Sequence, residues 1–342
     1  MKDPHLLKLI EAYEAAPAEF QATSYWQTYK KPILEALDKM DLNQLRSGSY
    51  PILASFGFNE FTFNKIGDLG TRTKIAGYAV NKSLVKNETL MPYSIDLSDI
   101  REMAYRHCEL YGELTHSRPI SELEVSAYGN PDDLFEIKGK KYTMQFLGFY
   151  IRYCFVNQQI NLNGEEVIVE LGSGSGHQIE LIKKLYPNAT VLCFDLPTQL
   201  YVCEKYLSQA LGGDKVVSSQ NCLDWNDLTN IEKGKVHFFG SWQMPLLSDF
   251  SFDIFWNAAS FGEMEPEVVE NYLSYVKGQC QWVYLLQARH GKEAKRVANP
   301  IRFEDYDRWL DQYSLVKEEE PYRAHMRLKE SGGYFQAVWK KS

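Results

Sequence analysis

A run of alternating glycines follows directly on a short apolar segment in the second half of the chain. Residues 167–171 are mostly aliphatic and β-branched, which is typical of a buried parallel strand. Glu170 lies at its end, and Gly172, Gly174 and Gly176 follow at every second position. Glycine has no Cβ, so it permits positive φ and lets a ligand approach the backbone closely. The spacing predicts a strand-to-helix turn whose amides face a nucleotide-like ligand.

The spacing of these glycines indicates which ligand the turn accepts. A pyrophosphate loop of the form Gly-x-Gly-x-x-Gly would need a glycine where this chain has His177 or Ile179. A carboxylate at Glu170 would repel a diphosphate, but it can accept a hydrogen bond from the ammonium group of a methionine moiety. The segment resembles the S-adenosylmethionine (SAM) motif of doubly wound methyltransferases. The cofactor-binding candidates in this turn are Glu170, Gly172, Ser173, Gly174 and Gly176.

A second acidic residue follows the next apolar run. Residues 190–194 end at Asp195, and Leu196-Pro197 then opens a helix, with proline at a position where its missing N–H costs nothing. An acid at this place, about twenty residues past the glycines, can bind ribose hydroxyls. Because SAM and NAD proteins both use such an acid, Asp195 and Leu196 predict a ribose-containing cofactor without distinguishing the two. The alternative is that Asp195 only caps the following helix.

Two further strand ends supply candidate contacts. After the strand expected at 236–239, Trp242 could stack on an adenine face and Ser241 could meet its polar edge, although Trp242 is equally explained as a lid on the core. After the strand expected at 252–256 comes Asn257, the last of the cofactor-binding candidates. Methyltransferases of amino groups and nucleobases commonly carry two prolines after this position. Here the sequence is Asn-Ala-Ala-Ser-Phe, which favours an oxygen acceptor.

Methyl transfer to a hydroxyl group needs alignment and benefits from a general base. The candidates are His290 and Glu263, and His290 is placed first because its unperturbed pKa lies near the working pH. His290 is equally explained as a surface-loop residue, and Glu263 as a cap of the helix beginning near Pro266. Arg289 and Lys292 could hold an anionic group, but a solvated basic loop is the simpler interpretation.

The order of segments predicts an α/β fold: a doubly wound, mostly parallel, Rossmann-like sheet with a mainly helical N-terminal domain. We expect residues 1–140 to form the helical region, which would select the acceptor or act as a lid, and residues 141–342 to bind SAM. Gly129-Asn130-Pro131 is a turn signal near this boundary. The polar insertion at 214–234 receives no assignment. The expected strands are 167–171, 190–194, 236–239, 252–256 and 282–287, followed by an antiparallel pair at 315–316 and 334–339.

Composition excludes several classes of function. The net charge is −8 and the chain has no basic run, so it is a poor candidate for holding a nucleic-acid backbone. No apolar run approaches membrane-spanning length, and the N-terminus does not resemble a secretory signal. The six cysteines and seven histidines show no metal-ligand spacing, so the sequence indicates no metal site, and a metal-assisted mechanism is kept only as an alternative. These features predict a cytoplasmic enzyme with a small-molecule or glycan acceptor, and they leave homo-oligomer formation open.

Several motifs are similar to those of the sugar O-methyltransferase family of bacterial surface-polysaccharide gene clusters. That resemblance implies SAM-dependent methylation of a hydroxyl on a sugar or glycan precursor. The Asp-Leu-Pro motif also resembles plant-type small-molecule O-methyltransferases, which place a catalytic histidine where this chain has Phe261 and Glu263. The alternatives are methylation of another hydroxylated molecule, such as a polyketide or phenol, and a non-catalytic SAM- or nucleotide-binding module. The motifs that carry the sugar-family resemblance are 170–176, 195–197, 260–264, 129–131 and, more faintly, 58–61.

Overall fold

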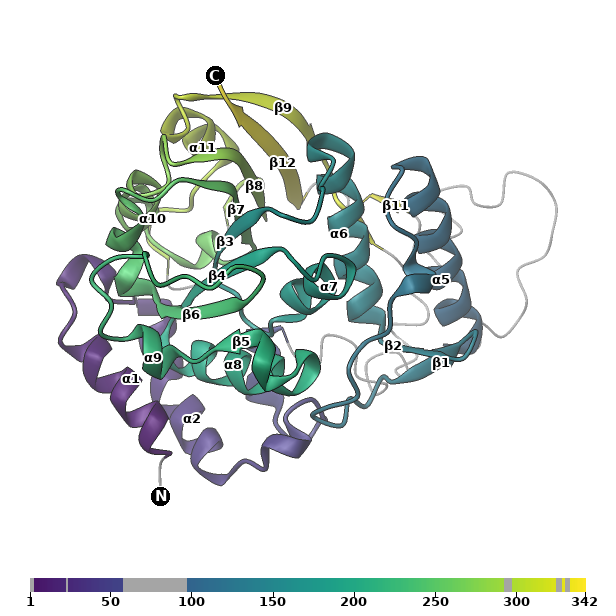
Figure 1. Cartoon of the computed structure of the whole chain (residues 1–342), viewed down its shortest axis with the longest axis horizontal. Helices are drawn as coiled ribbons and strands as arrows, with labels where there is room; N and C mark the ends of the chain where they lie inside the picture. The colour runs from purple at the N-terminus through teal and green to yellow at the C-terminus, as the bar shows by residue number, and fades with distance from the viewer. Residues whose placement is uncertain (1–2, 23, 58–96, 292–296, 324–327, 330–332) are drawn as a thin grey trace.

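The computed structural model describes residues 3–22, 24–57, 97–291, 297–323, 328–329 and 333–342. Its centre is an eight-stranded sheet (Figure 1). The strands from β5 to β8 run parallel, and β12 runs antiparallel to both of its neighbours. In spatial order the strands are β5 (Val216–Val217), β6 (Val236–Gly240), β4 (Thr190–Asp195), β3 (Val167–Leu171), β7 (Phe252–Ala258), β8 (Cys280–Ala288), β12 (Tyr334–Lys341) and β9 (Tyr313–Glu319).

Helices cover both faces of the sheet. One face packs against α6 (Met144–Ile160), α7 (His177–Leu185) and α8 (Pro197–Leu211), and the other against α10 (Pro266–Ser274) and α11 (Phe303–Trp309). Successive strand residues point to opposite faces, so Ile168 joins one core cluster and Val169 the other. Burial on both faces explains why the strands are continuous apolar runs rather than alternating ones. The predicted doubly wound α/β fold is confirmed.

The strand order places a crevice at one edge of the sheet. β3 pairs with β4 on one side and with β7 on the other, so the chain winds outward in two directions from β3. In open α/β sheets, ligands bind beyond the carboxyl ends of the strands at such a switch point. The glycine turn follows β3 directly and therefore lies at this crevice.

The N-terminal region is helical and packs on the sheet domain. α1 (Pro4–Glu14) lies against α8, α2 (Ser24–Lys39) precedes several short 3-10 turns, and α5 (Leu97–Leu114) lies along α6 (Figure 1). Buried residues of α1 and α6 belong to the same core cluster. The 3-10 turns are η1 (Ala18–Phe20), η2 (Leu42–Gln44), η3 (Pro51–Phe56) and η4 (Ile120–Glu122).

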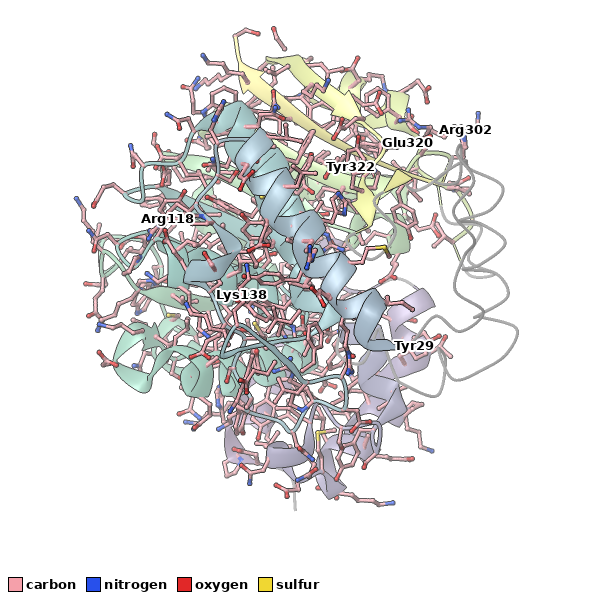
Figure 2. The ribbon with its side chains drawn as sticks, turned by 90° about the vertical axis from the view of Figure 1, so that its right-hand side faces the viewer. Tyr29, Arg118, Lys138, Arg302, Glu320 and Tyr322 are labelled. Atoms are coloured by element: carbon pink, nitrogen blue, oxygen red, sulfur yellow. The ribbon has the colours of Figure 1, made fainter. Side chains whose placement is uncertain are left out.

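Short strands join the two regions. The expected turn at Gly129-Asn130 is present, with φ values of 82° and 51°, and it leads into the hairpin of β1 (Phe135–Ile137) and β2 (Lys140–Tyr142). Near the other end of the chain, β10 (Tyr322–Arg323) pairs with β11 (Leu328–Lys329). The Tyr322 ring lies 5.4 Å from that of Tyr111 on α5, which places this segment against α5 (Figure 2).

The insertion at 214–234 extends the sheet. Val216 and Val217 form the edge strand β5, which pairs with β6, and α9 (Ser219–Cys222) follows. A two-residue strand is too short to show periodicity, which is why the sequence pattern predicts no element here. The last two strands form the predicted antiparallel pair, but β12 also pairs with β8, so only β9 lies at the edge. None of the described helices has the length and hydrophobicity needed to cross a membrane.

Candidate functional site

A cavity of about 400 Å³ lies at the carboxyl ends of the parallel strands. Its floor is formed by the turns that follow β3, β4, β6 and β7. Its walls come from α6 and from the N-terminal residues Gln21, Ala22, Trp26, Phe56 and Gly57. The cavity therefore lies between the cofactor-type turns of the sheet domain and the helical N-terminal region.

The glycine turn requires glycine at each of its three positions. Gly172, Gly174 and Gly176 have φ values of 79°, 52° and 74°, a region that residues with a Cβ rarely adopt. A Cβ at Gly174 would lie 2.8 Å from the carbonyl oxygen of Phe56, and one at Gly172 would lie 2.6 Å from the Ser260 side chain. Gly172 and Gly174 line the cavity together with Ser173, whereas Gly176 instead begins α7 against α8.

Asp195 is tied to the glycine turn. One carboxylate oxygen accepts a hydrogen bond from the backbone N–H of Gly174 at 2.9 Å, and the other accepts from Leu196 at 2.8 Å. Leu196, rather than Asp195, is the N-cap residue of α8, so the capping alternative does not describe this carboxylate. Both Asp195 and Leu196 line the cavity, as expected of residues that meet a ribose.

Three carboxyl groups line the same cavity, on Glu170, Asp195 and Glu263. Burial raises the pKa of Asp195 to about 7, and the nearby Glu263 charge adds to the rise. Burial also raises the pKa of Glu170, with a further contribution from Asp195, while Arg152 acts in the opposite direction. A bound cation would favour the ionised forms of these groups, so the cavity is suited to a positively charged ligand.

The loop after β7 is held by a buried amide network. The Asn257 side chain donates to the Leu171 carbonyl at 2.8 Å and to Ser260 Oγ at 2.7 Å. Its Oδ1 accepts from Gln287 Nε2 at 2.5 Å. Asn257 is 0% exposed and does not line the cavity, so it joins the ends of β3, β7 and β8 instead of meeting a ligand directly. Ala259, two residues after Asn257, has a positive φ of 64°, which places a strained residue at the cavity wall.

The two residues expected to meet adenine have different positions. Ser241 lines the cavity beside Tyr272. Trp242 does not line it, and its ring lies 5.4 Å from that of Tyr13 on α1. The alternative interpretation, in which Trp242 covers the core, describes its place better.

The two candidate bases are also separated. Glu263 is half-buried and lines the cavity at the end of the 3-10 turn η7 (Phe261–Glu263). His290 is exposed and lies outside the cavity. Arg289 forms a salt bridge with Glu318 and packs over aromatic rings of the C-terminal part, so its positive charge is already paired within the protein. Lys292 and residues 58–61 lie outside the described residues.

Sequence reasoning missed several cavity residues that come from outside the strand-to-turn motifs. Arg152 of α6 lines the cavity next to Phe149, and so do Trp26, Phe56 and Tyr334. Gln178 of α7 lines it too, and both of its side-chain polar atoms are buried without a hydrogen-bond partner. The amphipathic and aromatic patterns of these segments are also those of ordinary core residues, so position in the fold was needed to find them.

The residues present fit SAM. The glycine turn brings backbone amides to the cavity, acids stand at the ends of β3 and β4, and the unsatisfied amide of Gln178 calls for a polar partner. Within the described ranges, no cluster of three or more His, Cys, Asp or Glu side chains could hold a metal ion.

Comparison with known families agrees with this interpretation. Residues 150–220, which contain the glycine turn and Asp195, match the model of the O-methyltransferase domain. Together with the sheet order, this match confirms the predictions of a methyltransferase fold, a methyltransferase enzyme and SAM as cofactor. No curated protein matched the chain by sequence.

Similar solved structures include other methyltransferases. Magnesium protoporphyrin IX methyltransferase of Synechocystis PCC 6803, with bound SAH, is 9% identical over 58% of this chain and 83% of that chain, with a TM-score of 0.40. The mitomycin 7-O-methyltransferase MmcR is 9% identical over 58% and 54%, with a TM-score of 0.41. The pyocyanin biosynthetic protein PhzM is 14% identical over 56% and 58%, with a TM-score of 0.36.

Proposed function

We propose that this protein transfers the methyl group of SAM to a hydroxyl group of a small molecule, and that the acceptor is a sugar or glycan precursor. The observation that carries the proposal is a cavity that joins the SAM-type turn to an acidic residue, Glu263, and to aromatic walls. The match of residues 150–220 to the O-methyltransferase domain supports an oxygen acceptor.

In this proposal the floor of the cavity binds the cofactor. SAM, when bound, supplies a methyl group made electrophilic by the sulfonium. The backbone of Gly172 and Gly174 allows close approach, Asp195 accepts from ribose hydroxyls, and Glu170 accepts from the ammonium group. Leu196 and Ser241 then lie where the adenine would be expected, on the β4 and β6 side. The three carboxyl groups favour a cationic ligand over a neutral one.

Glu263 is the proposed general base. It lies on the wall after β7, where Ala258 and Ala259 leave room for an acceptor beside the cofactor. A carboxylate there can accept the proton of an acceptor hydroxyl as the oxygen attacks the methyl group, a contribution of roughly 10²–10⁴-fold. Asn257 acts as a positioning residue, because its network fixes the loop that carries Ala259 and Glu263.

The remaining walls support a ring-shaped hydroxylated acceptor. Trp26, Phe56 and Tyr334 offer aromatic surface, and Gln21 offers an amide beside them. Aromatic faces suit the apolar face of a sugar ring, and amide and carboxyl groups suit its hydroxyls. The same walls would accept a planar phenol or polyketide, which remains the second candidate acceptor class. Because Gln21, Trp26 and Phe56 lie within residues 1–140, we assign acceptor selection to this region.

The proposal also includes a cytoplasmic setting. All six cysteines are buried and none forms a disulfide, which is the usual state in a reducing compartment.

The test has two stages. Calorimetric titration with SAM and with NAD should show binding of SAM alone; binding of NAD without SAM would overturn the cofactor assignment. Purified protein is then incubated with SAM and panels of nucleotide sugars, glycans and phenols, and products are analysed by mass spectrometry. We expect a mass gain of one methyl group on a sugar. Transfer only to phenols would favour the second acceptor class, and SAM binding without any transfer would favour a non-catalytic module.

A further inference from the structure

An arginine in the cavity wall forms no salt bridge with the described residues. Arg152 of α6 is half-buried and lines the cavity, and no described carboxylate lies within salt-bridge distance of its guanidinium. The guanidinium packs on an aromatic ring: its central carbon lies 4.6 Å from the centroid of Phe149. A half-buried guanidinium carries five N–H donors and no acceptor, so an anionic ligand would be its natural complement.

The guanidinium packs against a pair of stacked rings that leads to the glycine turn. The ring of Phe149 stacks on His177 at 5.8 Å with an interplanar angle of 14°. His177 follows the last glycine of the turn, and its Nδ1 lies 2.6 Å from Ser175 Oγ. Arg152 and Phe149 therefore line the cavity together with the turn, and the Arg152 charge acts on Glu170 at the end of β3.

The opposite charge stands at the same end of the cavity. Glu170, at the end of β3, is 5% exposed and accepts no hydrogen bond from the described residues. Gln178 of α7 lies there as well, with an unpaired amide that can both donate and accept. A positive side chain, a negative side chain and an unpaired amide thus line one part of the cavity, the polar corner formed by Arg152, Glu170 and Gln178.

We propose that Arg152 binds the carboxylate of the methionine moiety of SAM, while Glu170 binds its ammonium group. The inference rests on the proposed function, since it concerns how the same cavity holds its cofactor. The two charges of an amino acid lie on neighbouring atoms, and the polar corner offers one complement to each. Arginine suits the first task because its planar fork can donate two parallel hydrogen bonds to a carboxylate.

The test compares SAM with decarboxylated SAM, which keeps the ammonium and sulfonium groups but lacks the carboxylate. Calorimetry on the full chain gives the ratio of the two dissociation constants for the wild type and for Arg152→Met. We expect the preference of the wild type for SAM to shrink by roughly 10- to 100-fold in Arg152→Met, the range typical of hydrogen bonds to charged groups. The ratio for Arg152→Lys should lie between those of the wild type and Arg152→Met, because lysine keeps the charge but lacks the planar fork of arginine.

Arg106→Met is the matched control, since it removes an exposed arginine that pairs with Glu102 on α5, outside the cavity. Its ratio should equal that of the wild type. Thermal unfolding of each variant checks that the fold is retained. An unchanged ratio in Arg152→Met would overturn the inference, and a raised KM for the acceptor alone would place Arg152 on the acceptor instead. If the wild type bound neither compound, the proposed function itself would fail.

Discussion

The two halves of the cavity are built in different ways. The proposed cofactor half comes from two strand-turn-helix units, β3 to α7 and β4 to α8, so its residues are close together in the chain. The proposed acceptor half is assembled from Gln21, Trp26, Phe56, Glu263 and Tyr334, which are far apart in the sequence. A local motif can therefore identify the cofactor, whereas the acceptor side depends on tertiary packing.

The halves also differ in how they are held. Asp195 and Asn257 tie the turns of the cofactor half to backbone groups within the sheet domain. The proposed acceptor half is held by contacts between the N-terminal region and the sheet domain, such as the hydrogen bond from the Gln145 side chain to the Gly57 carbonyl. Substitutions in the first half should therefore change cofactor binding, and those in the second should change turnover. Four experiments test this division.

The largest effect is expected for Glu263→Gln. Glutamine fills the same space but cannot accept a proton, so kcat should fall by roughly 10²–10⁴-fold. Steady-state kinetics measure the loss, and calorimetry should give an affinity for SAM within about threefold of the wild type. Full activity in this variant would remove Glu263 from the mechanism.

Gly174→Ala should break the cofactor half. Its φ of 52° disfavours alanine, and the new Cβ would meet the Phe56 carbonyl at 2.8 Å. We expect the affinity for SAM to fall by roughly 10- to 100-fold, from about 1–3 kcal/mol of backbone strain. The control is Gly148→Ala in α6, where a Cβ meets nothing within 4 Å and a helical alanine should stabilise the fold slightly. Equal affinities in the two variants would contradict the role of the turn.

Binding of SAM should depend on pH through Asp195. Because its pKa is about 7 in the unliganded protein, the carboxyl group is mostly protonated at pH 6 and mostly ionised at pH 7.5. Only the ionised form accepts from both ribose hydroxyls and the backbone, so the affinity should rise several-fold, up to roughly tenfold, over this range. Calorimetry in matched buffers measures the trend.

Asp195→Asn provides the comparison for that trend, because it should bind more weakly and lose most of the pH dependence. The raised pKa also affects stability. Between pH 3.8 and about 7 the folded protein holds a proton that the unfolded chain has released, so this group lowers the unfolding free energy as pH rises. If the affinity of the wild type for SAM did not change with pH, a group other than Asp195 would set the charge of the site.

The smallest effect is expected for His290→Ala. The side chain is exposed and outside the cavity, so kcat/KM should stay within about twofold of the wild type. A tenfold or larger loss of kcat/KM would indicate that His290 takes part in the reaction, and it would weaken the contrast between the two halves.

The turns after β3 and β4 could be placed at the cavity from the sequence for a physical reason. Glycine at positive φ, an acid at a strand end and apolar strands buried on both faces each leave a local pattern. The third glycine was assigned to the ligand, yet Gly176 packs against Cys203 and Leu207 of α8. Asn257 was likewise expected at the ligand. It belongs instead to a buried network that joins three strand ends, and such a network leaves no pattern in the sequence.

The choice of His290 depended on the assumption that the loop after β8 faces the crevice. The pairing of β12 with β8 extends to Ala288. The backbone N–H of Arg289 then donates a hydrogen bond to the Gly333 carbonyl, and its carbonyl accepts one from Phe303, so the chain continues along the antiparallel strands. Arg152 was missed for a different reason. Its helix, α6, is an apolar and aromatic segment. Only the position of this helix beside β3 shows that the Arg152 guanidinium reaches the cavity.

The contact between Phe56 and the glycine turn limits how this protein can be re-engineered. Its carbonyl occupies the space that a side chain at Gly174 would need, so the N-terminal region supplies part of the wall around the proposed cofactor site. A chimera that exchanged residues 1–140 to obtain a new acceptor would also exchange this wall. Successful recombination should therefore retain the backbone path through Phe56 and Gly57, with the crossover placed elsewhere.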